Sequence, residues 1–215
     1  MTDAPGPRRD LRARLFAWSL AHAGDADRRL YGARKRTLFA RLDAGPGRTV
    51  VEIGAGAGPN AAYLPAGTRW LVAEPNGFFY DTLRTAAERH DLALELLAGD
   101  AHALPLPDAS ADAVVSTLVL CSVGDPGAAL AEVRRVLRPG GAFLFVEHVA
   151  ADDGTWLRRL QRGLRAPWGW AGDGCRPDRD TLGAIRAAGF SRVEAEAFRV
   201  PLGLAAPHVA GIAWR

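Results

Sequence analysis

The chain has 215 residues, of which 48% are hydrophobic and 24% charged, a balance that suits one well-buried domain and is short for two. A net charge of +3 is too modest to indicate a nucleic-acid-binding protein. Only two cysteines occur, so no disulfide framework and no metal site are expected, and a reducing, cytoplasmic setting is the default. The absence of a long apolar run and of a secretory signal predicts a soluble protein.

The N-terminal part of the chain is expected to be helical. Residues 1–10 are rich in Pro, Gly and Arg and are expected to be disordered. Apolar residues fall at helical spacing over 11–20 and again over 28–42. The first helix has two interpretations: a lid over an active site, or an amphipathic helix on a membrane surface with its arginines toward lipid phosphates. We favour the first and expect residues 11–44 to form lid helices.

Residues 49–60, TVVEIGAGAGPN, form the most informative motif of the chain. They predict a buried strand that runs directly into a glycine-rich turn. Glycine adopts positive φ and has no Cβ, so such a turn lets the backbone pass close to a nucleotide. The spacing is G-x-G-x-G, and Pro59 stands where a dinucleotide-binding loop has its third glycine. This spacing opposes a nicotinamide dehydrogenase.

Strands and helices alternate through the rest of the chain, which indicates an α/β fold with a parallel sheet and right-handed crossovers. A single domain is expected over 11–215, and it closes with an antiparallel hairpin. The expected strands are 49–53, 69–73, 94–97, 113–120, 142–149, 193–197 and 209–214, and the expected helices between them are 81–90, 128–137 and 180–188.

Residues 151–178 interrupt this alternation. They contain Trp156, Trp168 and Trp170, half of the tryptophans of the chain. Aromatic walls suit an apolar or planar small molecule, so this insertion is expected to select the substrate. The alternative is a hydrophobic cap on the sheet.

Polar residues follow the ends of successive strands, where ligands bind in open α/β sheets. Glu74 lies twenty residues after Gly54 and is placed to accept hydrogen bonds from both hydroxyls of a ribose. Asp100 is placed to accept from an adenine amino group, with the backbone N–H of Ala101 beside the ring. Each residue alone fits an ordinary turn, but their occurrence in order predicts an adenosine site.

Five sequence segments resemble one family of small-molecule enzymes. They are VVEIGAGAGPN at 50–60, STLVLCSV at 116–123, VRRVLRPGGAFLFVEHVAA at 133–151, GDGC at 172–175 and PHVAG at 207–211. From residue 49 to its end the chain resembles class I S-adenosylmethionine-dependent methyltransferases, and within them the alkyl-thiol S-methyltransferases (methyltransferase-like family 7), as a bacterial, soluble relative. The animal members begin with a hydrophobic membrane-associating segment, and this chain has only residues 11–20 there.

The resemblance implies a Rossmann-like, seven-stranded and mostly parallel sheet, with S-adenosyl-L-methionine as cofactor. It also places Tyr31 near the methionine end of that cofactor. The expected cofactor-binding residues are Tyr31, Glu52, Gly54, Ala55, Gly56, Asn60, Glu74, Pro75, Asp100, Ala101, Thr117 and Leu118.

The resemblance further implies S-methylation of a small hydrophobic thiol, in detoxification or in the tailoring of, or self-protection against, a thiol natural product. The alternatives are C-, O- or N-methylation of a quinone precursor, phenol or lipid head group, and a non-catalytic adenosylmethionine-binding module. A thiol is only a few per cent thiolate at neutral pH, so a proton acceptor is expected.

His148, at the end of the fifth strand, is the expected general base, and Asp173 is expected to orient a histidine or bind substrate. Each also has a purely structural interpretation. Cys121 is expected to be a small core residue. The expected substrate-pocket residues are Trp156, Trp168, Trp170, Cys175 and His208.

Overall fold

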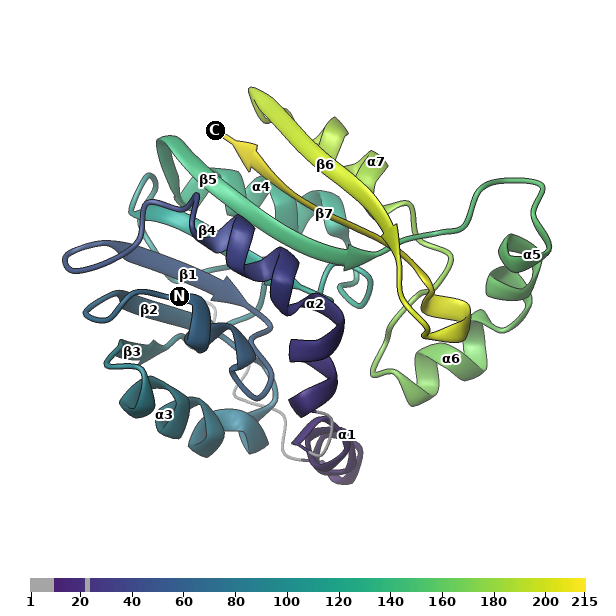
Figure 1. The fold of residues 1–215 in the computed structure, drawn as a ribbon, viewed down its shortest axis with the longest axis horizontal. Helices are drawn as coiled ribbons and strands as arrows, with labels where there is room; N and C mark the ends of the chain where they lie inside the picture. Colours follow the sequence, from purple (N-terminus) through teal and green to yellow (C-terminus); the bar gives the residue numbers. More distant parts are fainter. Residues whose placement is uncertain (1–9, 22–23) are drawn as a thin grey trace.

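The structure is a computed structural model that describes residues 10–21 and 24–215. The disorder expected for residues 1–10 therefore lies, except for Asp10, outside the described residues. The helices are α1 (Leu11–Ala21), α2 (Gly24–Phe39), α3 (Tyr80–Arg89), α4 (Pro126–Val136), α5 (Trp156–Gly163), α6 (Arg165–Ala171) and α7 (Thr181–Ala187) (Figure 1). The strands are β1 (Thr49–Ile53), β2 (Arg69–Ala73), β3 (Ala93–Leu96), β4 (Ala111–Thr117), β5 (Leu137–His148), β6 (Arg192–Arg199) and β7 (Pro207–Trp214).

All of these strands join one seven-stranded sheet in the order β3-β2-β1-β4-β5-β7-β6. β7 pairs antiparallel with β5 and with β6, and the other neighbours are parallel. The predicted α/β sheet with a C-terminal antiparallel hairpin is thus confirmed. The strand order reverses between β1 and β4, so the loops after these two strands diverge and leave a crevice at their carboxyl ends.

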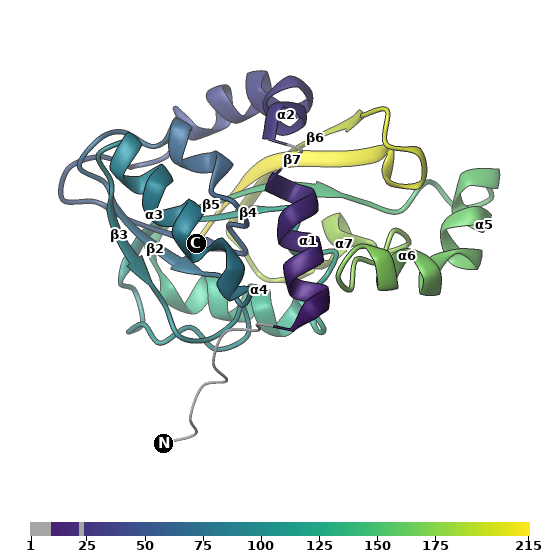
Figure 2. The ribbon, with the colours of Figure 1, turned by 90° about the horizontal axis from the view of Figure 1, so that it is seen from below.

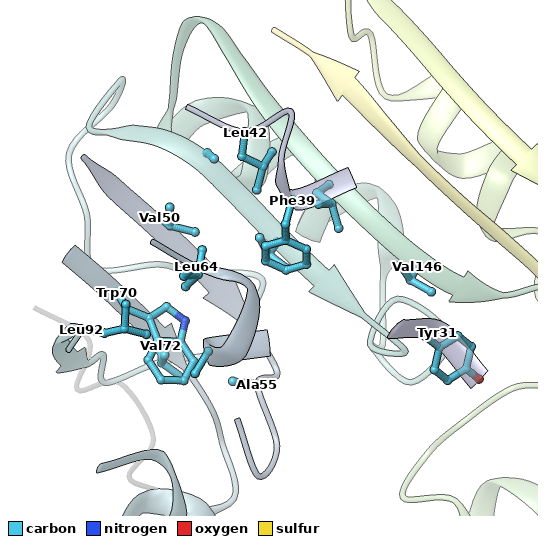
Figure 3. Packing of buried hydrophobic residues seen from close by; sticks show 14 of the residues in the cluster. Tyr31, Phe39, Leu42, Val50, Ala55, Leu64, Trp70, Val72, Leu92 and Val146 are labelled. Carbon is cyan, nitrogen blue, oxygen red and sulfur yellow. The ribbon is translucent and has the colours of Figure 1, made fainter. Parts of the chain in front are cut away.

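Helices cover both faces of the sheet, α2 and α3 on one side and α4 and α7 on the other (Figure 2). The central strands are apolar at successive positions because side chains alternate between the two faces, and both faces are buried. In β1, for example, Val50 packs with Phe39 of α2 on the first face (Figure 3), whereas Val51 faces the second.

Several strand boundaries differ from the expected ones, and the end of β4 is the difference that shapes the crevice. β4 ends at Thr117 rather than at residue 120, because Leu118 takes a left-handed conformation with φ of 59°. The chain therefore turns over residues 118–123 instead of continuing as a strand. β5 begins at Leu137, before the expected residue 142, and the segment 138–141 between them interrupts its pairing with β4.

Candidate active site

A cavity of about 1430 Å³ lies at the carboxyl ends of β1, β2 and β4. It is lined by every residue that the sequence predicted to bind the cofactor. Of the expected acceptor-side residues, His148, Trp168, Asp173, Cys175 and His208 also line it. The fold thus brings one candidate site together from segments that are far apart in the sequence.

Two expected pocket residues do not belong to this cavity. Trp156 is 70% exposed and Trp170 is 75% exposed, and neither lines it. Both lie on short helices, Trp156 on α5 and Trp170 on α6. Their assignment to the substrate pocket is wrong, and the tryptophan of the insertion that reaches the cavity is Trp168.

The glycine turn after β1 is tied to Glu74 at the end of β2. The backbone N–H of Gly56 donates to Glu74 Oε2 at 2.8 Å, and that of Asn76 donates to Oε1 at 2.8 Å. Gly54 and Gly56 have φ of 61° and 54°. A Cβ on Gly54 would lie 2.6 Å from Val119 Cγ2, whereas a Cβ on Gly56 would meet nothing closer than Leu20 Cδ1 at 4.0 Å. The turn therefore packs tightly at Gly54 and leaves open space at Gly56.

Glu52 lies beneath this turn and supports it. Its carboxylate is 1% exposed and accepts from Asn60 Nδ2 at 2.8 Å and from Trp70 Nε1 at 2.8 Å. Burial raises the pKa of Glu52 to about 7. Asn60 Nδ2 also donates to Thr117 Oγ1 at 3.0 Å. Asn60 Oδ1 is buried and, within the described part of the chain, has no hydrogen-bond partner.

Asp100 lies in the loop after β3 and lines the cavity. Its Oδ1 accepts from the backbone N–H of His102 at 2.8 Å, and its side chain is 48% exposed. The neighbouring Ala101 is buried against Leu104. Asp100 is therefore the more accessible of the two expected adenosine carboxylates.

Tyr31 of α2 and His208 of β7 form a buried pair. Nδ1 of His208 lies 3.2 Å from the carbonyl oxygen of Ala206 and donates to it, so Nε2 accepts from the Tyr31 hydroxyl at 2.9 Å. Burial lowers the pKa of His208 to about 4 and raises that of Tyr31. Both side chains are neutral near pH 7, and both ring nitrogens of His208 are already engaged, Nδ1 by Ala206 and Nε2 by Tyr31.

Cys121, His148 and Cys175 form a cluster at the cavity. One ligand atom from each lies within 4.8 Å of the others. His148 Nε2 is 2.8 Å from Cys175 Sγ, and Trp168 Nε1 donates to the same sulfur at 3.2 Å. The pKa of the Cys175 thiol is lowered, first by a hydrogen bond from Cys121 and then by His148, whereas that of Cys121 is raised. The expectation that Cys121 is a buried core residue is confirmed, since it is 1% exposed, but the fold also places it beside Cys175, which the sequence did not predict.

Asp173 precedes this cluster in the loop between α6 and α7. It has φ of 50°, and its Oδ1 lies 3.8 Å from Arg12 Nε of α1. Arg12 also donates to the carbonyl oxygen of Gly169 at 3.0 Å. The contacts bring α1 against the loop that carries Cys175, and Asp173 takes part in that attachment.

The N-terminal helices contribute further to the cavity wall through Phe16 and Leu20 of α1 and Tyr31 of α2. Their location fits the lid that the sequence predicted for 11–44, and that role stays a prediction. Over residues 10–21 and 24–215, the helices are too short or too polar to cross a membrane.

Glu147 supports the site from beneath the cavity wall, and the sequence interpretation gave it no role. Its side chain is fully buried, and Oε1 accepts from Ser116 Oγ at 2.7 Å and from the backbone N–H groups of Val119 and Leu120 at 3.1 and 3.2 Å. These bonds hold the turn that carries Cys121. Glu147 lies in the motif FVEHVAA, and its partners lie in the motif STLVLCSV. The contact between the two motifs follows only from the pairing of β4 with β5.

Known proteins share this architecture and much of this sequence. A family model described as "Methyltransferase domain" matches residues 51–145. The human thiol S-methyltransferase TMT1A is 40% identical over 190 residues, which cover 84% of this chain and 78% of that protein. The chain belongs to the TMT1A family of class I S-adenosylmethionine-dependent methyltransferases.

More distantly similar proteins are named as methyltransferases of carbon acceptors. The ubiquinone/menaquinone biosynthesis C-methyltransferase UbiE of Caulobacter vibrioides is 31% identical over 190 residues, covering 74% of each chain. Geranyl diphosphate C-methyltransferase from Streptomyces coelicolor superimposes with a TM-score of 0.68 at 16% identity, over 87% of this chain and 77% of that one. This likeness shows the fold alone and confirms the Rossmann-like sheet.

The cofactor of this methyltransferase is S-adenosyl-L-methionine, and the cavity fits it. The open space at Gly56 is a cradle that a side chain would fill. Asn60 Oδ1 is a buried acceptor without a partner among the described residues, and it lines the same cavity. A buried acceptor of this kind suits a ligand with hydrogen-bond donors, and this cofactor carries amino and hydroxyl groups.

Proposed function

We propose that this methyltransferase transfers the methyl group of S-adenosyl-L-methionine to the sulfur of a small, hydrophobic thiol. The observation that carries the proposal is the cluster of Cys121, His148 and Cys175, which lines the same cavity as the cofactor-binding turn. The 40% identity to a protein named as a thiol S-methyltransferase supports the same acceptor. Detoxification of thiols, or tailoring of a thiol natural product, would use such an activity.

The cofactor supplies an electrophilic methyl group on a positively charged sulfonium. We assign Glu74 to the ribose hydroxyls and Asp100 to the adenine amino group, because these carboxylates line one cavity at successive strand ends. Asn60 Oδ1 is assigned to a donor group of the same ligand. These residues hold the cofactor in one orientation, which is the main requirement of an in-line transfer.

The acceptor thiol must lose its proton, because the thiolate is the nucleophile. His148 is our proposed proton acceptor, as the sequence predicted. Its Nε2 faces Cys175 Sγ, and its Nδ1 is buried with no partner among residues 10–21 and 24–215. Cys175 therefore orients the imidazole, and the two side chains act as a unit at the acceptor end of the cavity.

Besides this cluster, Asp173 and the Tyr31–His208 pair, apolar side chains contribute to the cavity wall. Phe16, Leu20 and Leu202 line it together with Trp168. Such a wall favours an acceptor with an alkyl or aryl body and disfavours a charged one. A hydrophobic thiol meets both conditions.

Methylation at carbon is the alternative, and the 31% identity to UbiE favours it. A quinone precursor also has a planar, apolar body that this wall would accommodate. A phenol, an amine or a lipid head group belongs to the same set of rivals. These acceptors have no need of a thiol–imidazole cluster beside the methyl group.

One experiment separates these acceptors. The purified protein and S-adenosyl-L-methionine are incubated with alkyl and aryl thiols, each beside its matched alcohol, amine and phenol, and with a quinone precursor. Methylated products are identified by mass. We expect products from the thiols alone, and methylation restricted to carbon, oxygen or nitrogen would overturn the proposal.

The surface variant Trp156→Ala is a matched control for this assay. Its side chain is 70% exposed and lies outside the cavity, so acceptor preference should not change. His148→Ala should lose activity toward thiols added at neutral pH. It should recover part of that activity above about pH 9, where thiols ionise without help.

A further inference from the structure

Three segments of the chain converge at the acceptor end of the cavity with donor atoms that metals bind. Cys121 lies in the turn after β4, His148 ends β5, and Cys175 lies between α6 and α7. One ligand atom from each lies within 4.8 Å of the other two. Two thiols and one imidazole form a donor set that zinc prefers. Catalytic zinc sites have three protein ligands and keep the fourth position for water or substrate.

We propose that Cys121, His148 and Cys175 bind a zinc ion, and that the acceptor thiol occupies the fourth position as its thiolate. The part of this proposal that concerns the acceptor rests on the proposed function, whereas metal binding itself does not. With the ion bound, His148 is a ligand, and this role replaces that of proton acceptor assigned to it above for the metal-free site. The acceptor's S–H proton then passes to solvent as its sulfur binds the ion. The new carbon–sulfur bond then forms as the bond from the methyl carbon to the sulfonium sulfur breaks, which releases a neutral thioether.

The two cysteine segments are held together by the surrounding backbone. The N–H of Arg176 donates to the carbonyl oxygen of Cys121 at 2.9 Å. Arg179 Nη1 donates to the carbonyl oxygens of Leu120 and Val123, both at 2.6 Å. Glu147, the neighbour of His148, binds the backbone of the same turn. The three ligands are therefore positioned by the fold.

The surroundings of the sulfurs suit thiolate ligands. Trp168 Nε1 donates to Cys175 Sγ at 3.2 Å, and Ser122 Oγ lies 3.6 Å from Cys121 Sγ. Hydrogen bonds to ligating sulfur are the usual outer layer of such sites. Two thiolates neutralise the charge of a zinc ion, so a third, from the acceptor, leaves one negative charge facing the positive sulfonium.

The spacing of the ligands requires a small adjustment on binding. Zinc–sulfur and zinc–nitrogen distances of about 2.3 and 2.0 Å place tetrahedral ligands about 3.5 Å apart. His148 Nε2 and Cys175 Sγ are 2.8 Å apart and would separate by several tenths of an ångström. Cys175 follows Gly174, whose φ is 92°, in a loop with a second glycine at 172. Glycine gives this loop the conformational freedom for such a shift.

The test uses cobalt(II), whose absorption reports thiolate ligation independently of catalysis. The full chain is stripped with a chelator under reducing conditions and titrated with Co²⁺, and zinc content is measured on untreated protein. We expect one equivalent of Co²⁺ to produce thiolate charge-transfer and visible bands. Cys121→Ser and Cys175→Ser should each lose these bands, and His90→Ala, a histidine outside the cluster, should keep them. Absence of the bands, or their persistence in either cysteine variant, overturns the proposal.

Two further readouts keep the metal and the methyl acceptor separate. Trp168→Phe keeps an aromatic ring in the cavity wall and removes the donor to Cys175, so it should bind Co²⁺ about 10-fold more weakly while it folds normally. Addition of an arylalkyl thiol should shift the visible bands, and the matched alcohol should not. If Co²⁺ binds but no thiol is methylated, the proposed function fails and the metal site stands. Undiminished thiol methylation by chelator-treated protein would remove the metal from the reaction.

Discussion

The hydroxyl of Tyr31 donates a hydrogen bond of 2.9 Å to Nε2 of His208, across 177 residues of sequence. It joins α2 to β7, the last strand of the chain, directly beside the cavity. His208 in turn stacks edge-on to His148 with 6.1 Å between ring centroids. α2 is therefore fastened to the acceptor end of the site through one neutral, buried pair.

Removal of the Tyr31 hydroxyl should loosen this attachment. In Tyr31→Phe the Nε2 of His208 stays buried without its donor, which costs about 1–3 kcal/mol of unfolding free energy. Urea denaturation measures this loss. A double-mutant cycle adds His208→Phe. This substitution should cost much less unfolding free energy in the Tyr31→Phe background than in the natural protein. Additive losses would show that the pair is not coupled.

Substitutions at two positions of the glycine turn should affect cofactor binding and folding stability differently. Gly54→Ala and Gly56→Ala both place a Cβ at positive φ, but only the first meets Val119 at 2.6 Å. Gly54→Ala should therefore destabilise the fold strongly, and Val119→Ala should restore part of the loss. Gly56→Ala should cost only about 1 kcal/mol of folding, yet it should abolish the thermal shift produced by S-adenosylhomocysteine.

Gly47→Ala is the matched control for this pair. Its φ is 77°, and a Cβ there would meet nothing within 4 Å. It should carry the same backbone strain as Gly56→Ala and leave the ligand-induced thermal shift unchanged. An equal loss of ligand binding in both variants would mean that backbone strain, and not the filled cradle, is responsible.

Glu52 should make the protein less stable as pH rises. Burial raises its pKa from 4.5 to about 7, so between these values the folded state holds a proton that the unfolded state has lost. Stability conferred by protonation is present below pH 4.5 and is lost as pH rises to 7, a change of about 3 kcal/mol. The midpoint of urea denaturation, measured at about pH 5 and about pH 8, reports it.

Glu52→Gln isolates this contribution from that of other titrating groups. The amide does not titrate, so the stability difference between the variant and the natural protein should narrow as pH rises. At low pH the variant should be the less stable one, because its amide nitrogen faces a donor from Asn60 or Trp70. A difference that is constant with pH would contradict the raised pKa.

Trp168 should affect the acceptor and not the cofactor. Trp168→Ala removes a cavity wall and the hydrogen bond to Cys175 Sγ, so KM for hydrophobic thiols should rise about 10-fold or more. The dissociation constant of S-adenosylhomocysteine, measured by calorimetry, should be nearly unchanged. Trp170→Ala is the control, since that side chain is 75% exposed and lies outside the cavity. Equal effects of both substitutions would contradict the assignment of the pocket.

Local patterns were sufficient for the fold and for the cofactor side of the site. The unbroken apolar strands, the glycine spacing and the carboxylates Glu74 and Asp100 are each contained in a few consecutive residues. Parallel strands bring their carboxyl ends to one edge of a sheet, so the cofactor residues meet wherever such strands pair in order. For this reason the predicted cofactor-binding residues line one cavity in the structure.

The acceptor side depended on tertiary structure. Trp156 and Trp168 are the same residue type in the same insertion. Only the arrangement of α5 and α6 decides that Trp156 is exposed and that Trp168 lines the cavity. The apolar residues before Cys121 predicted a strand that continues to residue 120. The turn that replaces the end of this strand is held by Glu147, which is distant in sequence. Contacts between distant segments have no local signature.

The sequence by itself thus determined the family, the cofactor and the edge of the sheet where the reaction takes place. The tertiary structure decided that Cys121, His148 and Cys175 share one site and that Tyr31 is joined to His208. The physical reason is that local spacing specifies strands and turns, whereas side chains from three separate segments converge only after the sheet has formed.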